Sequence, residues 1–208
     1  IFAVPIGVLA GIYLSEYATE NRWTRLIRIA IINLAGIPSV VYGLFGLGLF
    51  VLFLKFGTSI LAASLTLSIM TLPVIISTTE EALHSVPNSF RVVSTSLGAT
   101  RWQTIRHVVL PQALPGIVTG AVLAMSRAAG ETAPILVVGA AFLTPALPSS
   151  PFDQFMALPY HLYTAAAHVP GMPKSVMWAT ALVLLAVVLT FNFIAFGIRL
   201  RARRRRTR

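Results

Sequence analysis

The sequence lacks cysteine and is poor in acidic residues: of 208 residues only six are Asp or Glu, and Asp153 is the only aspartate. The absence of cysteine excludes disulfides, thiolate metal sites and thiol catalysis. A single aspartate leaves a Ser/His/Asp arrangement without support, and no GxxxxGK[ST] phosphate loop occurs. We therefore expect nucleotide to bind on another chain, and no cofactor to be bound by this one.

Charge of either sign is scarce, whereas apolar residues are abundant. Charged residues make up 11% and hydrophobic residues 56% of the chain, with a mean hydropathy of +0.82. Soluble domains have about a quarter charged residues. The composition therefore predicts an integral membrane protein. The net charge of +10 raises the question of nucleic acid, and its answer depends on where the charges lie.

Five apolar runs are separated by polar segments, and together they predict an all-α, polytopic transmembrane helical bundle. The first run is too short to span, since its residues would extend only about 21 Å as a helix. We expect that the sequence begins inside a helix; a cleaved signal peptide is the alternative, but the run has no basic leader. The runs are Ile1–Leu14, Leu26–Leu54, Thr58–Thr78, Leu114–Ala141 and Val176–Ile198.

Proline and glycine residues interrupt the runs at defined places. Pro38, beside Ser39, predicts a bent or broken helix in the second run, although ordinary small-residue packing would also explain its glycines. Pro73 predicts a kink in the third run. Gly130 and Pro134 are expected to open the fourth run. We take these residues as candidate gating or kink positions.

The basic residues gather on one side of the predicted membrane. Segments 15–28, 79–111 and 199–208 hold thirteen of the sixteen Lys and Arg residues. Because cytoplasmic loops collect basic residues, we place these segments in the cytoplasm and loop 142–175 outside. Residues 1–198 then form the transmembrane domain. The tail 199–208 is interpreted as a lipid anchor rather than an RNA-binding segment.

The cytoplasmic segment 79–111 is patterned for helices. Two capping boxes are predicted, one at Thr78 and Glu81 and one at Thr100 and Gln103, the second opening a helix over Arg101–Val109 before Pro111 starts the next span. Between them, a helix is expected to restart at Pro87 and to end at Gly98. Its apolar edge, which would lie on lipid or in a partner's groove, is formed by Phe90, Val93 and Leu97.

Two ionisable residues lie inside an apolar run. Arg127 and Glu131 are four apart and share a helix face, with Thr132 beside them. Arginine offers a planar fork of donors to the oxygens of an oxyanion, and an ionised glutamate accepts a hydrogen bond from an anion that retains a proton. The pair is a candidate translocation site. The alternative is a self-neutralising pair that fixes helix packing.

Histidines offer a weaker signal. His161 and His168 lie in the outer loop near aromatic residues, but too few ligands surround them to predict a metal site. A docking surface or an interfacial aromatic belt explains them equally. A short helix is expected over Phe155–Ala167.

Several segments resemble a known family. Gly98, followed after nine residues by Val108-Val109-Leu110-Pro111, resembles the signature of permeases of bacterial ATP-binding-cassette importers, although Val92-Val93-Ser94 stands where Glu-Ala-Ala is usual. More narrowly, the chain resembles the phosphate-importer permeases, the PstA family. The segments that carry this resemblance are 12–18, 33–47, 79–83, 127–134 and 156–163.

The resemblance implies a permease subunit of the bacterial plasma membrane that moves phosphate by alternating access. The implied partners are a sister permease (PstC-like), two ATPase subunits (PstB-like) that bind ATP and Mg, and an extracytoplasmic phosphate-binding protein (PstS-like), together with membrane lipid and no nucleic acid. It also implies that residues of the 79–111 segment contact the ATPase: Ser89, Phe90, Val93, Ser94, Leu97, Gly98 and Ala99.

Three other functions stay open at this point. The chain could carry another oxyanion such as sulfate or molybdate, which uptake competition would distinguish. It could be an intramembrane enzyme that uses Glu131 with a histidine, or a channel or carrier that works without an ATPase. The helix-bearing cytoplasmic segment disfavours the last of these, because such a carrier needs no helix presented to a partner.

Overall fold

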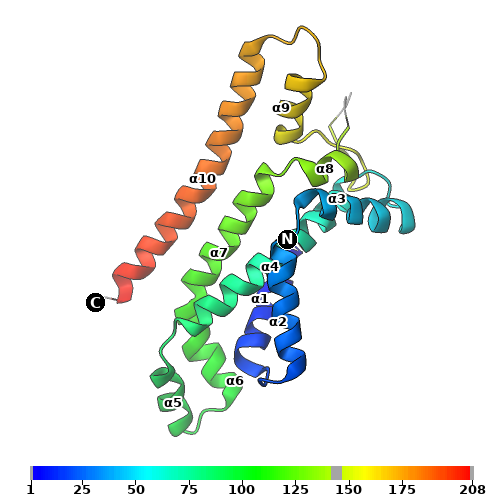
Figure 1. Cartoon of the computed structure of the whole chain (residues 1–208). Helices are drawn as coiled ribbons and strands as arrows, with labels where there is room; N and C mark the ends of the chain where they lie inside the picture. The colour runs from blue at the N-terminus through cyan, green and yellow to red at the C-terminus, as the bar shows by residue number, and fades with distance from the viewer. Residues whose placement is uncertain (1, 142–146, 207–208) are drawn as a thin grey trace. The chain divides into compact units, whose positions relative to one another are not determined.

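The computed structural model describes residues 2–141 and 147–206, and these are helical throughout apart from connecting segments and a single β-bridge pair (Figure 1). The all-α prediction is confirmed. In chain order the elements are α1 (Ala3–Ile12), η1 (Tyr13–Tyr17), α2 (Arg22–Ala35), α3 (Ser39–Gly46), η2 (Leu47–Phe53), α4 (Ile60–His84), α5 (Asn88–Ser96), α6 (Arg101–Thr104), η3 (Ile105–Val109), α7 (Leu110–Gly130), α8 (Ala133–Val138), α9 (Leu158–Ala167) and α10 (Lys174–Arg206).

The helices form two compact units. Unit 1 contains Ile1–Ala35, Leu72–Ala124 and Asn192–Arg208, and unit 2 contains Gly36–Thr71 and Met125–Phe191. Helices α4, α7 and α10 therefore contribute residues to both.

Within the described residues, three helices are long and apolar enough to cross a membrane: Ile60–His84, Arg101–Gly130 and Lys174–Leu200. Helix α2 followed by α3 and η2 passes the same test as a bent pair, which gives up to four spans. The first apolar run forms the shorter helix Ala3–Tyr17. Each predicted run therefore corresponds to an apolar helix or a broken one.

The predicted breaks occur where proline and glycine place them. Helix α2 ends at Ala35, Pro38 is the N-cap of α3, and Ser39 is its first residue. The fourth run is not one helix, because α7 ends at Gly130 and α8 begins at Ala133. Gly130 has no side chain that could pack and stabilise the helix at its end. Pro134 lies in the first turn of α8, where its missing N–H costs nothing.

Proline does not interrupt the third run. Helix α4 is continuous through Pro73, so the kink expected there stays a prediction.

The capping box predicted at Thr78 and Glu81 is wrong. Both residues lie inside α4, and the Thr78 hydroxyl donates to the carbonyls of Val74 and Ile75 in the preceding turn. The helix continues to His84 because its next turn still has a buried apolar face. A Thr-x-x-Glu pattern caps a helix only where the backbone has already left the helical conformation.

The helix expected over Arg101–Val109 is α6 with η3, and α7 begins at Leu110, one residue before Pro111. The segments nevertheless join into one helix from Arg101 to Gly130, so no break separates them. The π-helical turn η3 precedes Pro111, which has no backbone N–H to donate. The wider hydrogen-bonding pattern of η3 accommodates this missing donor.

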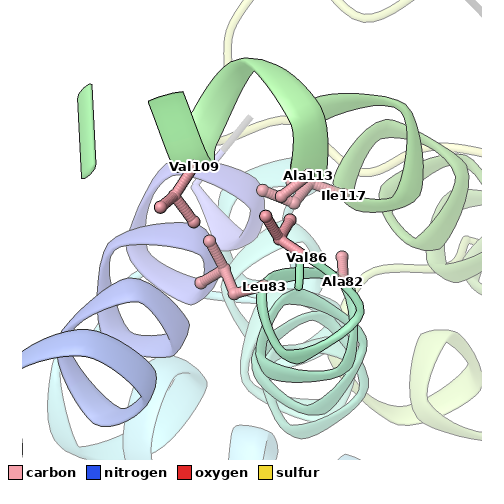
Figure 2. Close-up of a cluster of buried hydrophobic side chains, with 6 residues drawn as sticks. All are labelled: Ala82, Leu83, Val86, Val109, Ala113 and Ile117. Atoms are coloured by element: carbon pink, nitrogen blue, oxygen red, sulfur yellow. The ribbon is translucent and has the colours of Figure 1, made fainter. Parts of the chain in front are cut away.

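The core of unit 1 joins the end of α4 to the start of α7. Figure 2 shows its side chains, which come from α4, the turn after it, η3 and α7. Val8 and Ile12 of α1 pack against the same cluster. The cluster fixes the place where the chain leaves α4 and turns toward α5. Its members are Ala82, Leu83, Val86, Val109, Ala113 and Ile117.

Glycines let two helices approach α4 closely. A Cβ built on Gly11 of α1 would lie 2.7 Å from the Thr79 Cβ, and one built on Gly120 of α7 would lie 2.6 Å from the Thr78 Cβ. Gly116, one turn before Gly120, meets Ala82 in the same way at 2.8 Å. Because real side-chain contacts need more room, only glycine allows these crossings.

In unit 2, the loop before α9 caps the start of α4. The Ile60 and Leu61 amides donate to the carbonyls of Asp153 and Pro151, at 3.0 and 2.9 Å. The Asp153 carboxylate accepts bonds from the Ser149 and Ser150 amides at 2.8 and 2.9 Å, which lowers the pKa of this carboxyl. The loop thus supplies acceptors to helix amides that would otherwise lack partners.

The short helix expected over 155–167 is α9, which begins three residues later, at Leu158. Phe155 does not join it because its backbone pairs with Gly139 and Ala141 instead.

Replacing Gly120 by Ala is expected to destabilise the protein by about 1–3 kcal/mol, because the added methyl overpacks the α4–α7 crossing. Thermal unfolding in detergent measures this. Gly197→Ala is the matched control, since a Cβ there meets nothing within 4 Å. Equal stability of the two variants would contradict the close crossing.

Acidification is expected to open the loop that Asp153 holds through Ser149 and Ser150. The folded-state pKa of Asp153 lies below its ordinary value of 3.8, so the stabilisation is present above about pH 4 and is lost as the pH falls through the lowered pKa. The protection of the Ser149 and Ser150 amides against hydrogen exchange, relative to the intrinsic rate at each pH, should fall over that range. Asp153→Asn should remove the pH dependence; an unchanged profile would count against the carboxylate.

Candidate functional site

Helix α5 presents an apolar edge to its surroundings. None of its residues is buried, and Leu97, its C-cap, is 84% exposed. Pro87 begins the helix and Gly98, with φ +84°, ends it in the left-handed conformation that glycine favours. The predicted limits and apolar edge are confirmed. The exposed apolar residues, called the α5 edge below, are Phe90, Val92, Val93 and Leu97.

Arg91 holds α5 in place, and sequence reasoning missed this role. Its Nη2 donates to Glu16 Oε1 at 2.6 Å and its Nε donates to Glu16 Oε2 at 3.3 Å. The same guanidinium donates to the carbonyls of Val86 and Leu83, at 2.9 and 3.0 Å. The Glu16 side chain is 8% exposed and that of Arg91 21%, so this pair is largely shielded from water. No sequence signal joins residues that lie 75 positions apart.

A second contact joins α5 to α6. The Ser94 and Thr104 hydroxyls lie 2.9 Å apart. The capping box predicted at Thr100 and Gln103 is confirmed, since each residue's side chain accepts from the other's backbone amide. The Ala99 amide donates to the Ser94 carbonyl, while Ser89 lies exposed in the first turn of α5. These contacts fix both ends of α5 and leave its apolar edge outward.

In unit 2, the structure brings Arg127 and Glu131 together. Arg127 Nε lies 3.4 Å from Glu131 Oε1; the arginine side chain is 51% exposed and the glutamate side chain 16%. Arg127 lies in the last turn of α7, where the helix dipole favours a cation, and Glu131 lies just beyond the helix end. Thr132 follows as the N-cap of α8, without a side-chain capping bond. The pair therefore stands at the break between α7 and α8.

Helix α3 packs on α8 next to this break. A Cβ built on Gly43 would lie 2.9 Å from the Cα of Pro134, so the two backbones approach closely. Pro38 and Ser39 at the start of α3 thus belong to the element that contacts Pro134. Around Gly130, by contrast, a Cβ would meet nothing within 4 Å.

His161 and His168 are not brought together as ligands. The Thr180 hydroxyl donates to the Val176 carbonyl and lies 3.2 Å from His161 Nδ1, within hydrogen-bonding distance. His168 packs against the Tyr163 ring, with centroids 5.0 Å apart. Among the described residues no group of three or more potential ligands could hold a metal ion.

The family model for the binding-protein-dependent transport system inner membrane component matches residues 3–207. The chain belongs to this family. As a member of the transport-permease family, it has curated relatives that include the phosphate transport system permease protein PstA 1 of Mycobacterium tuberculosis, 39% identical over 99% of this chain and 67% of the relative. The probable ABC transporter permease protein YqgI of Bacillus subtilis is 36% identical over 94% of this chain and 70% of its own length. The chain thus spans about two thirds of these permeases.

Among solved structures, the permease fold matches a chain of the MetNI methionine ABC transporter in an inward-facing conformation. The TM-score is 0.77 over 97% of this chain and 88% of that chain, with 21% sequence identity. At this identity the likeness shows the fold alone. With the family match, it makes the chain an inner-membrane permease of an ABC importer, a transport component.

Replacing Glu16 by Gln is expected to loosen α5, because the Arg91 charge then lacks a carboxylate in a shielded site. The cost is on the order of 3 kcal/mol. Thermal unfolding and the rate of proteolysis within residues 85–100 measure the effect.

Glu20→Gln is the control for this variant. Glu20 pairs with Arg28 at 2.7 Å but is 76% exposed, so its loss should cost less than about 1 kcal/mol. Equal effects of the two substitutions would show that the Arg91 contact does not hold α5.

Proposed function

We propose that the chain is the permease subunit of a phosphate importer, with Arg127 and Glu131 on the translocation path. The observation that carries this proposal is the geometry of Arg127. Glu131 engages only its Nε, while half of the side chain stays exposed. The family membership and the names of several relatives, which are phosphate transport system permeases, support the same substrate.

The pair suits a phosphate that must bind briefly and leave. The terminal nitrogens of Arg127 can donate to two phosphate oxygens in the fork geometry that guanidinium groups favour. Glu131 lowers the local positive charge and, when ionised, accepts a hydrogen bond from the O–H of a phosphate that retains a proton. Sulfate has no such proton at neutral pH. A weak, charge-balanced site of this kind matches the need of a transport path for transient binding.

Movement of the permease is coupled to ATP through α5. Its apolar edge docks in a groove of an ATPase subunit, where ATP and Mg bind, and the Arg91 contacts transfer the movement of α5 to the end of α4. Because Arg101–Gly130 is one continuous helix, a shift of α6 also reaches Arg127. The helix breaks at residues 36–38 and 131–132 let the spans rearrange. Residues 85–100 and the C-terminus face the cytoplasm, where the basic residues gather.

The assembly in this proposal contains a sister permease, two ATPase subunits and an external phosphate-binding protein, as in the PstC, PstB and PstS components. Another oxyanion is the second candidate substrate, since an arginine fork also binds sulfate or molybdate. Competition between phosphate and sulfate during uptake distinguishes them, because Glu131 favours only an anion that keeps a proton.

Replacing Arg127 by Gln should reduce phosphate uptake by about ten- to a hundredfold, the loss expected for a charged hydrogen-bonding group. Radiolabelled phosphate uptake by cells or proteoliposomes measures this. Co-purification of the partner subunits should be unchanged, which separates transport from assembly. Arg25→Gln, on exposed α2, is the control. Normal uptake by Arg127→Gln would sink the proposal.

A further inference from the structure

The segment that contains α5 and α6 carries cations without acids. From Ala82 to Ala124 the sequence has no Asp or Glu, whereas it contains Arg91, Arg101 and Arg106. Val92 also stands where the permease signature usually has glutamate. Helices α5 and α6 therefore have no acidic residue of their own to offer a partner.

A cavity of about 370 Å³ lies beside α5 in this region. Its walls come from η1, the end of α4, the first turn of α5 and the start of α6. Glu16 is the only acid among them, and Arg91 already occupies both of its carboxylate oxygens. The lining residues are Ser15, Glu16, His84, Asn88, Arg91 and Arg101.

Arg101 is the unneutralised cation of this cavity. Its guanidinium carbon lies 5.4 Å from the centre of the Tyr17 ring, which orients the side chain. Among the described residues Arg101 makes no ion pair, and its side chain is exposed. The Ser15 hydroxyl also lines the cavity and, although its oxygen is buried, it has no hydrogen-bond partner in the described part of the chain. The Asn88 amide adds two further donor hydrogens.

The walls thus offer donors and one free positive charge, but the only carboxylate is already paired. The ligand that fits is an acceptor-rich, negatively charged group small enough for the cavity. A carboxylate side chain meets this description, because its two oxygens can accept from Arg101, Asn88 and Ser15 together.

We propose that this cavity receives an acidic side chain of the ATPase partner, so that the permease supplies the cation and the ATPase supplies the acid. The inference rests on the proposed docking of the α5 edge on that ATPase. The apolar edge buries area, and the Arg101 site beside it sets the register of α5 in the groove. Charge complementarity selects this occupant: a cavity whose one carboxylate is already paired with Arg91, and whose Arg101 makes no ion pair among the described residues, attracts an acidic side chain and repels a basic one.

The test uses the full transporter, purified through a tag on this permease. Retention of the ATPase is measured at increasing salt for the wild type, Arg101→Gln and Arg101→Glu. Arg101→Gln should weaken retention about tenfold and flatten its salt dependence, while Arg101→Glu should release the ATPase at low salt. Arg101→Lys keeps the charge and should retain most of the binding. Thermal unfolding of the isolated permease checks that each variant folds.

Arg106→Glu is the matched control, because this exposed arginine lies on the same helix but does not line the cavity. Equal loss with Arg106→Glu would overturn the proposal, since the charge would then act at a distance rather than in the cavity. Leu97→Asp tests the proposed function separately, by placing a charge on the α5 edge. If Leu97→Asp releases the ATPase and Arg101→Glu does not, the carboxylate site is wrong and the docking of α5 stands. If neither releases it, both are wrong.

Discussion

The contact of Arg91 with Glu16 and with two backbone carbonyls determines where α5 lies. Helix α5 has no buried residue, so packing alone does not hold it against unit 1. A short helix of this kind would be marginal in isolation, because nucleation is costly and few hydrogen bonds repay it. The Arg91 guanidinium compensates for the missing packing and for the small number of hydrogen bonds in the helix. It satisfies two carbonyls near the end of α4 and binds a carboxylate from η1, so that three segments meet at one planar group.

Around this contact, the rest of unit 1 is built for close approach. Glycines on α1 and α7 bring both helices against α4 without intervening side chains. The cluster in Figure 2 then closes the space between α4 and α7 where the chain turns into α5. Tight crossings of this type leave little freedom for one helix to slide while its neighbour stays still. A force on α5 is therefore shared among α1, α4 and α7.

Sequence reasoning succeeded where the signal is local. Hydrophobic length identified the apolar helices, and proline with glycine identified the breaks at residues 36–38 and 131–132. Arg127 and Glu131 could be paired because four residues of helix separate them. Two similar capping patterns had opposite outcomes: Thr100 caps a helix, whereas Thr78 lies within one. The difference lies in the apolar face that continues past Thr78, a tertiary effect that a four-residue pattern does not contain.

The positive charge of Arg91 and the negative charge of Glu16 also cannot trade places. Because the arginine faces the carbonyl oxygens of Leu83 and Val86 as well as a carboxylate, a glutamate at position 91 would place negative charge against two acceptors. Swapping the two charges therefore gives no equivalent pair, unlike an ordinary salt bridge at a surface. The acid must stay on η1 and the base on α5 for as long as α4 ends where it does.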